Sequence, residues 1–135
     1  MCGDHFTDEE SFAVYAYRHH RNEATERLSD FLTHALDQLR MIERLLDLLK
    51  ARKIARALED FEVELASWPV EYSLDAPESY VEAKKAAINN WLRGVRVALS
   101  TSPPNIIFAK AALASIEKLL CNERDRIGGY GGCDG

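Results

Sequence analysis

The side chains best suited to bind a metal in this 135-residue chain are its four histidines, His5, His19, His20 and His34. A helical metal site places ligands four residues apart, or pairs a glutamate with a histidine three residues later. No two of these histidines are four residues apart, and none follows a glutamate by three residues. We therefore predict no metal site and no cofactor, and we expect the histidines at a solvated surface or an interface.

Nucleophilic side chains lack the sequence contexts that activate them. The three cysteines, Cys2, Cys121 and Cys133, do not form the even set of a disulfide framework. We expect a reduced chain in which Cys121 is a buried or half-buried thiol on an amphipathic helix. No serine has the Gly-x-Ser-x-Gly context, and no Gly-x-x-x-x-Gly-Lys phosphate loop is present. We predict no catalytic residue and a protein that is not an enzyme.

One pair of polar residues has the spacing of a known catalytic signature. Arg27 and His34 are separated by six residues, and this spacing resembles the Arg-x(4–6)-His motif of the helical HEPN ribonucleases. In that family the two side chains act on the scissile phosphate of RNA. The polar residue that usually follows the arginine is Leu28 in this chain. The alternative is an ordinary pair on a helix surface.

A leucine-rich stretch resembles the first helix of the all-helical chorismate mutases. That helix carries an LLxLLxxRxxLA pattern after an upstream arginine, and both arginines grip the substrate carboxylates. Residues 45–55 are similar to this pattern and place Arg52 at the matching arginine, whereas the upstream position holds Ala35. The resemblance implies an alternative function, a small helical enzyme that binds an anionic substrate through Arg40, Arg52 and Lys53.

The distribution of charge bears on nucleic acid and on protein partners. The net charge of −5 argues against general affinity for phosphate, although the basic residues 50–56 leave nucleic-acid binding as a further alternative. Residues 58–82 carry eight acids and no base. We expect Glu59, Glu62 and Glu64 in this segment to steer a basic partner. The other interpretation is that the acids dock on basic helices of the same chain or are solvated.

Aromatic and cationic residues are densest near the N-terminus. Phe12, Tyr15, Tyr17 and Arg21 belong to this cluster, and tyrosine and arginine dominate the energetics of many protein interfaces. A helix over this segment is apolar on nearly every side, so something must cover it. We predict that these four residues anchor a partner, with ordinary core packing as the alternative.

Apolar residues at helical spacing predict the elements that position these residues. The strongest row steps by seven through Leu28, Ala35, Ile42 and Leu49. A capping box at residues 7–10 starts a first helix over residues 8–21, although the content of residues 12–17 also suits a short strand. We expect a second helix from residue 22 or 23 to residue 50.

The later boundaries follow from breaks in the apolar rows and from proline and glycine. We expect a break near Lys50–Lys53, with one long helix as the alternative, and a third helix that ends at Trp68-Pro69. Asp75 and Pro77 start a fourth helix, whose apolar stripe includes Trp91 and whose Gly94 marks a close helix crossing. Ser102 caps the last helix, and Gly128-Gly129 stops it.

Together these elements predict an all-α protein, a compact bundle of four to five antiparallel helices. We expect a single domain over residues 1–127 and a disordered, Gly-rich tail over residues 128–135. No apolar stretch approaches the ~20 residues of a membrane span, and the acidic start differs from a secretory signal. We therefore expect a cytoplasmic protein without a membrane partner.

The function that this interpretation favours is regulation by binding. A wide apolar stripe on the second predicted helix offers more surface than one small bundle needs, so we expect a homodimer. We interpret the chain as a non-enzymatic regulator, of the anti-activator, inhibitor or neutraliser type, that binds and occludes another protein. A transcription factor, or another regulator with a basic or apolar interface, is the kind of partner expected.

Overall fold

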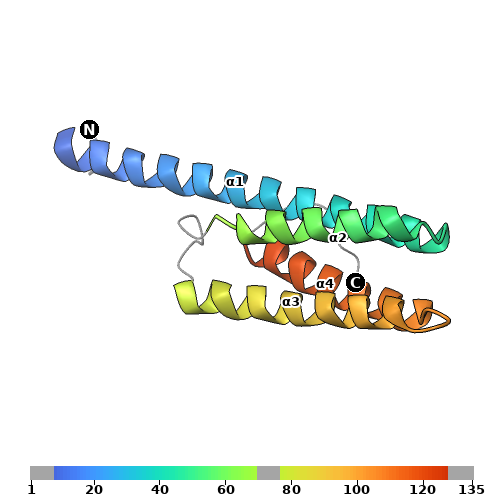
Figure 1. The fold of residues 1–135 in the computed structure, drawn as a ribbon. Coiled ribbons are helices and arrows are strands. Elements are labelled where there is room, and N and C mark those ends of the chain that lie inside the picture. The colour runs from blue at the N-terminus through green and yellow to red at the C-terminus, as the bar shows by residue number, and fades with distance from the viewer. Residues whose placement is uncertain (1–7, 70–76, 128–135) are drawn as a thin grey trace.

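The computed structural model describes the backbone of residues 8–69 and 77–127, and side chains from residue 23 onward within these ranges. This part of the chain is all-helical and forms a bundle (Figure 1). Its elements in chain order are α1 (Asp8–Asp47), α2 (Ala51–Ala66), α3 (Glu78–Ser100) and α4 (Ile106–Arg126). Successive helices run in opposite directions, which confirms the predicted antiparallel arrangement. The Gly-rich tail and the Asp75 cap lie outside the described residues.

The first two predicted helices are one continuous helix, α1, of 40 residues. The expected boundary between residues 21 and 22 is wrong, as is the strand alternative for residues 12–17. No proline or glycine lies within α1 to remove a backbone hydrogen bond or loosen the chain. A change of side-chain composition near Arg21 therefore leaves the helix intact.

The break between α1 and α2 lies close to where the apolar row predicted it. The amides of Leu49 and Lys50 donate to the carbonyls of Leu46 and Leu45, respectively, which is the pattern of a Schellman cap. Leu49 has φ 53°, a left-handed conformation that usually belongs to glycine or asparagine. The chain thus turns without glycine, and residues 23–67 form two helices rather than one.

The starts of the later helices differ slightly from the sequence-based boundaries. Pro77 is the N-cap of α3 instead of lying in its first turn. Asn105 caps α4, because its side chain accepts a hydrogen bond from the amide of Phe108 at 3.0 Å. Ser102, the predicted cap, lies three residues upstream of this position. The N-cap is the residue at which the backbone enters the helix, and two prolines after Ser102 delay that point.

The core is a single apolar cluster to which all four helices contribute. Most predicted rows are buried, but Leu49 and Trp91 are exposed. Leu49 leaves the row because α1 ends at Asp47, and Trp91 lies outside the buried stripe of α3. Gly94 does mark a close approach, since a Cβ there would lie 3.3 Å from the ring of Phe108 on α4.

Packing between the helices is uneven. The helix α1 packs against α2 and α4, α3 packs against α4, and α2 makes fewer contacts with α3. The weak α2–α3 contact leaves a groove that is described below. Cys121 near the end of α4 is buried, one of the two states expected for it, but it is disulfide-bonded, so the expectation of a reduced thiol is wrong. No helix among the described residues is long and apolar enough to cross a membrane.

Candidate binding surfaces

The N-terminal part of α1 projects beyond the other three helices (Figure 1). The helix has 40 residues, whereas α2, α3 and α4 have 16 to 23. At ~1.5 Å per residue, α1 is about 60 Å long and the other helices are about 24–35 Å long. The side chains of α1 are described from residue 23 onward, and those that belong to the core lie between Ala24 and Leu46. We refer to residues 8–22, the part of α1 that precedes the described side chains, as the α1 extension.

Four of the predicted interface residues, Phe12, Tyr15, Tyr17 and Arg21, belong to the α1 extension. Their backbone is helical, and their side chains lie outside the described part of the structure. On a helix, positions 12 and 15 are neighbours on one face, and positions 17 and 21 are neighbours on another. The four residues are therefore spread around the helix, as the sequence indicated.

The three glutamates that we expected to steer a partner are placed differently from one another. Glu62 forms an ion pair with Arg96 on α3, and Glu64 lies 3.9 Å from the imidazole of His34 on α1. Glu59 is exposed on α2. Two of the three carboxylates therefore face other helices of the same chain, so part of the acidic segment docks internally.

A groove runs between α2 and α3 at the end of the bundle where both helix–helix turns lie. Its volume is about 590 Å³, within the range of small-molecule sites. We call it the turn-end groove, and its lining is Leu49, Ala51, Ile54, Ala55, Leu58, Arg96, Leu99, Ser100, Pro103, Pro104 and Ile106. Among the described residues of this lining, Arg96 alone is charged. The groove exists because α2 and α3 pack loosely here.

Positive charge surrounds the turn-end groove. Residues 40–58 and 93–114, which form this end of the bundle, carry nine Lys or Arg and two Asp or Glu, a net charge of +7. The rest of the chain carries eight bases and twenty acids, a net charge of −12. Within the described residues, most large exposed apolar side chains also belong to these two stretches: Met41, Leu48, Leu49, Val97, Ile107 and Phe108. One end of the bundle is thus both basic and apolar.

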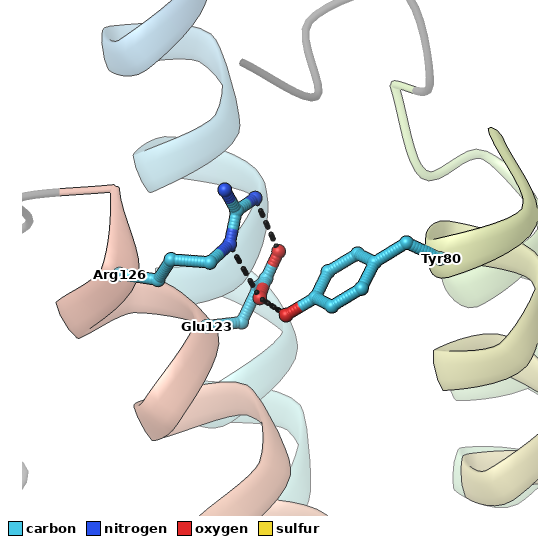
Figure 2. Close-up of polar contacts among 3 residues, drawn as sticks. All are labelled: Tyr80, Glu123 and Arg126. Atoms are coloured by element: carbon cyan, nitrogen blue, oxygen red, sulfur yellow. Dashed lines mark hydrogen bonds and ion pairs between the residues drawn. The ribbon is translucent and has the colours of Figure 1, made fainter. Parts of the chain in front are cut away.

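A second polar feature joins α3 to α4. The hydroxyl of Tyr80 donates to the carboxylate of Glu123 at 2.8 Å, and the guanidinium of Arg126 donates to the same carboxylate at 2.7 and 3.0 Å (Figure 2). The Glu123 side chain is only 2% exposed. Lys84 and Arg126 each lie 5.2 Å from the centre of the Tyr80 ring, so two cations flank the buried carboxylate.

These contacts determine the charge of Glu123. Burial alone would raise the pKa of Glu123, but the hydrogen bonds from Arg126 and Tyr80 and the charges of Arg126 and Lys84 outweigh it and lower the pKa below 4.5. Burial and the bond to Glu123 raise the pKa of Tyr80. An ionised, fully engaged carboxylate is not available as a general acid or base. We interpret this network as a structural link between α3 and α4.

A carboxyl pair links α1 to α4. Burial, followed by the charge and hydrogen bond of Glu117, raises the pKa of Glu43 above 4.5, although Lys110 and Arg40 oppose the shift.

The sequence analysis did not predict this pair or the Tyr80–Glu123–Arg126 network. The i, i+3 spacing of Glu123 and Arg126 is visible in the sequence, but their burial is not. For the turn-end groove, the available signal was the absence of acids from residue 83 to residue 116.

Arg27 and His34, the pair with the ribonuclease-like spacing, line one cavity in the structure. This cavity of about 410 Å³ is lined by Arg27, Asp30, Phe31, His34, Glu64, Ser67 and Pro69. Arg27 donates to Glu23 at 3.2 Å. Carboxylates from Asp30 and Glu64 share the cavity and would repel an RNA phosphate. The geometry therefore adds no support to the resemblance beyond proximity.

The predicted anionic-substrate residues do not converge. Arg40 pairs with Asp37 at 3.5 Å on the same helix, and Arg52 and Lys53 are exposed on α2. None of the three lines the cavities described above.

Within the described ranges, no group of three or more His, Cys, Asp or Glu side chains could hold a metal ion. Comparison with protein families, curated proteins and solved structures finds no match.

Proposed function

We propose that this protein is a non-enzymatic regulator that binds another protein through the α1 extension and occludes the surface it covers. The observation that supports the proposal is the length of α1. This helix extends beyond the ends of the other three helices (Figure 1). Phe12, Tyr15, Tyr17 and Arg21 are the proposed anchors. The partner is a regulator, for example a transcription factor, with an apolar groove.

The physical reason is the need of an apolar helix for a packing partner. The α1 extension continues a 40-residue helix but lies beyond the ends of α2, α3 and α4 (Figure 1), and most helical stability in proteins comes from packing of an apolar face. The α1 extension has 15 residues, and its sequence is rich in aromatic side chains. Docking in a partner's groove would bury these side chains in the helix-in-groove mode, with tyrosine and arginine as anchors.

The acidic residues take a smaller part in this proposal. Glu59 is exposed and is the best placed of the three to attract a basic partner surface. Glu62 forms an ion pair with Arg96, which weakens its attraction for an approaching basic protein, and Glu64 lies beside His34 on α1. Pairing of two α1 extensions in a homodimer is the self-association that we expect when no partner is present.

The test is affinity capture of the tagged protein from its host lysate at low and high salt, with quantification by mass spectrometry. The proposal predicts one stoichiometric partner that survives high salt, and its loss with the triple variant Phe12→Ser, Tyr15→Ser, Tyr17→Ser. A matched control replaces three exposed apolar residues of the bundle, Met41, Val63 and Val97, with serine. If both variants retain the partner equally, the α1 extension does not bind it.

A further inference from the structure

The turn-end groove combines an apolar interior with one cation that reaches across it. Its floor includes Ile54 and Leu58 of α2, which are buried in the core, and Leu99 of α3. Arg96 projects from α3 to form an ion pair with Glu62 on α2, so its guanidinium lies between the two helices. The guanidinium has five N–H donors, and one carboxylate does not use all of them.

The electrostatic surroundings favour a negative ligand. Residues 40–58 and 93–114, which form this end of the bundle, carry a net charge of +7, or +6 with Glu62 included, in a chain whose net charge is −5. Exposed cations lie on the same α2 segment as the lining residues, at Lys50, Arg52, Lys53 and Arg56. A concave site lined by one sign of charge raises the local concentration of ions of the opposite sign.

Leu49 gives a separate reason to expect a ligand. It lines the groove, is 67% exposed, and adopts a left-handed conformation that is unfavourable for a leucine. Glycine or asparagine would suit this helix cap better. Neither backbone geometry nor burial in the core accounts for an apolar side chain at this position, whereas contact with an apolar ligand in the groove does.

We infer that the turn-end groove binds a free anionic amphiphile, a molecule with an apolar chain and one anionic head group. The chain lies against Leu49, Ile54 and Leu99, and the head group takes donors of Arg96 that Glu62 leaves available. A concave groove suits a monomeric ligand rather than the surface of a bilayer. This site is separate from the α1 extension and does not depend on the proposed protein-binding function.

The test compares three ligands that share one alkyl chain, decanoate, decanol and decylamine, by isothermal titration calorimetry below their aggregation concentrations. We expect decanoate to bind with 1:1 stoichiometry, decanol to bind at least about tenfold more weakly, and decylamine not to bind. The factor is that of one hydrogen-bonded ion pair. Equal affinity for the three ligands, or no binding of decanoate, would overturn the inference.

Variants locate the ligand. Arg96→Gln should remove the preference for decanoate over decanol and leave decanol binding unchanged. Arg93→Gln, which removes the same charge from an exposed residue outside the groove, should keep the preference. Ala55→Trp should block both ligands because Ala55 lines the groove. The inference is contradicted if the two arginine variants behave alike, or if Ala55→Trp leaves binding unchanged.

Two other occupants give different results in the same series. Binding to vesicles of phosphatidylglycerol without binding to monomeric decanoate would mean that this end contacts a membrane, which would overturn the inference. A second copy of the chain in the groove would be detected by sedimentation velocity. In that case Ala55→Trp would lower the sedimentation coefficient of the ligand-free protein, and decanoate would fail to bind. This result would also overturn the inference that the groove binds an anionic amphiphile. Circular dichroism melts of all variants confirm that they fold.

Discussion

The hydroxyl of Tyr80 on α3 donates a 2.8 Å hydrogen bond to the carboxylate of Glu123 on α4. This bond joins the two helices beside the salt bridge from Arg126, and it satisfies a carboxylate that is almost fully buried. A buried charge that loses a partner is costly, because the desolvation penalty of the group remains. Removal of either partner of this hydrogen bond should therefore lower the free energy of unfolding.

The first prediction concerns the hydroxyl of Tyr80. Tyr80→Phe keeps the ring and its two neighbouring cations but removes one donor to Glu123. We expect the free energy of unfolding to fall by about 1.5–3 kcal/mol, as for other hydrogen bonds to charged groups. Urea denaturation at neutral pH measures this change. Ser79→Ala, at the exposed preceding residue, is the control and should alter stability by less than about 0.5 kcal/mol.

The second prediction concerns the carboxyl pair between α1 and α4. Because the pKa of Glu43 is raised in the folded chain, the folded state binds its proton more tightly than the unfolded state does. The protonated pair is therefore favourable in acid, and this stability is lost as pH rises through the raised pKa. Glu43→Gln removes the repulsion and should raise the melting temperature at pH 7.

The pH dependence of that difference identifies its origin. The advantage of Glu43→Gln should shrink as pH falls through the raised pKa and should be gone below the unfolded pKa of 4.5. Melting curves of both proteins from pH 4 to pH 8 measure it. An advantage of constant size across this range would show that ionisation of the buried Glu43 beside Glu117 is not its cause.

The third prediction concerns the cap of α1. Leu49 is exposed and has a positive φ, so Leu49→Gly should relieve backbone strain with little loss of buried surface. We expect stability to rise by about 1 kcal/mol. Leu48→Gly is the matched control, because the preceding residue is equally exposed but lacks a positive φ. That variant should be destabilised by about 0.5–1 kcal/mol.

The fourth prediction concerns Gly94 in α3. A methyl group there would lie 3.3 Å from the ring of Phe108, and this ring is half exposed and free to shift by a few tenths of an ångström. Alanine also favours the helix by about 1 kcal/mol over glycine. Gly94→Ala should therefore raise the free energy of unfolding by about 0.5–1 kcal/mol. A loss of stability in urea denaturation would mean that the ring cannot move.

Helix type and most of the core were predictable, because apolar periodicity reports directly which face of a helix is buried. The Leu28, Ala35 and Ile42 row is fully buried or nearly so. Leu49 has the same spacing but is exposed, since the row continued past the end of the helix. The expected boundary after Arg21 is wrong because no proline or glycine there interrupts the backbone of α1.

The candidate sites were less predictable, because they depend on which helices are neighbours. Arg96 and Glu62 are 34 residues apart in sequence, and only the α2–α3 arrangement brings them together. The same is true of Tyr80 and Glu123. The α1 extension is different, since its aromatic content was evident from sequence alone. Its overhang, however, follows from the shorter lengths of the other helices.

Hydrogen exchange of the α1 extension is the most direct measurement on the central proposal. In the dilute, isolated protein we predict that amides of residues 8–22 exchange far faster than those of the buried stretch of α1. Addition of the captured partner should slow exchange in residues 8–22 specifically. Equal protection of both parts of α1 in the free monomer, or unchanged exchange in the complex, would contradict the proposal that this extension is the docking element.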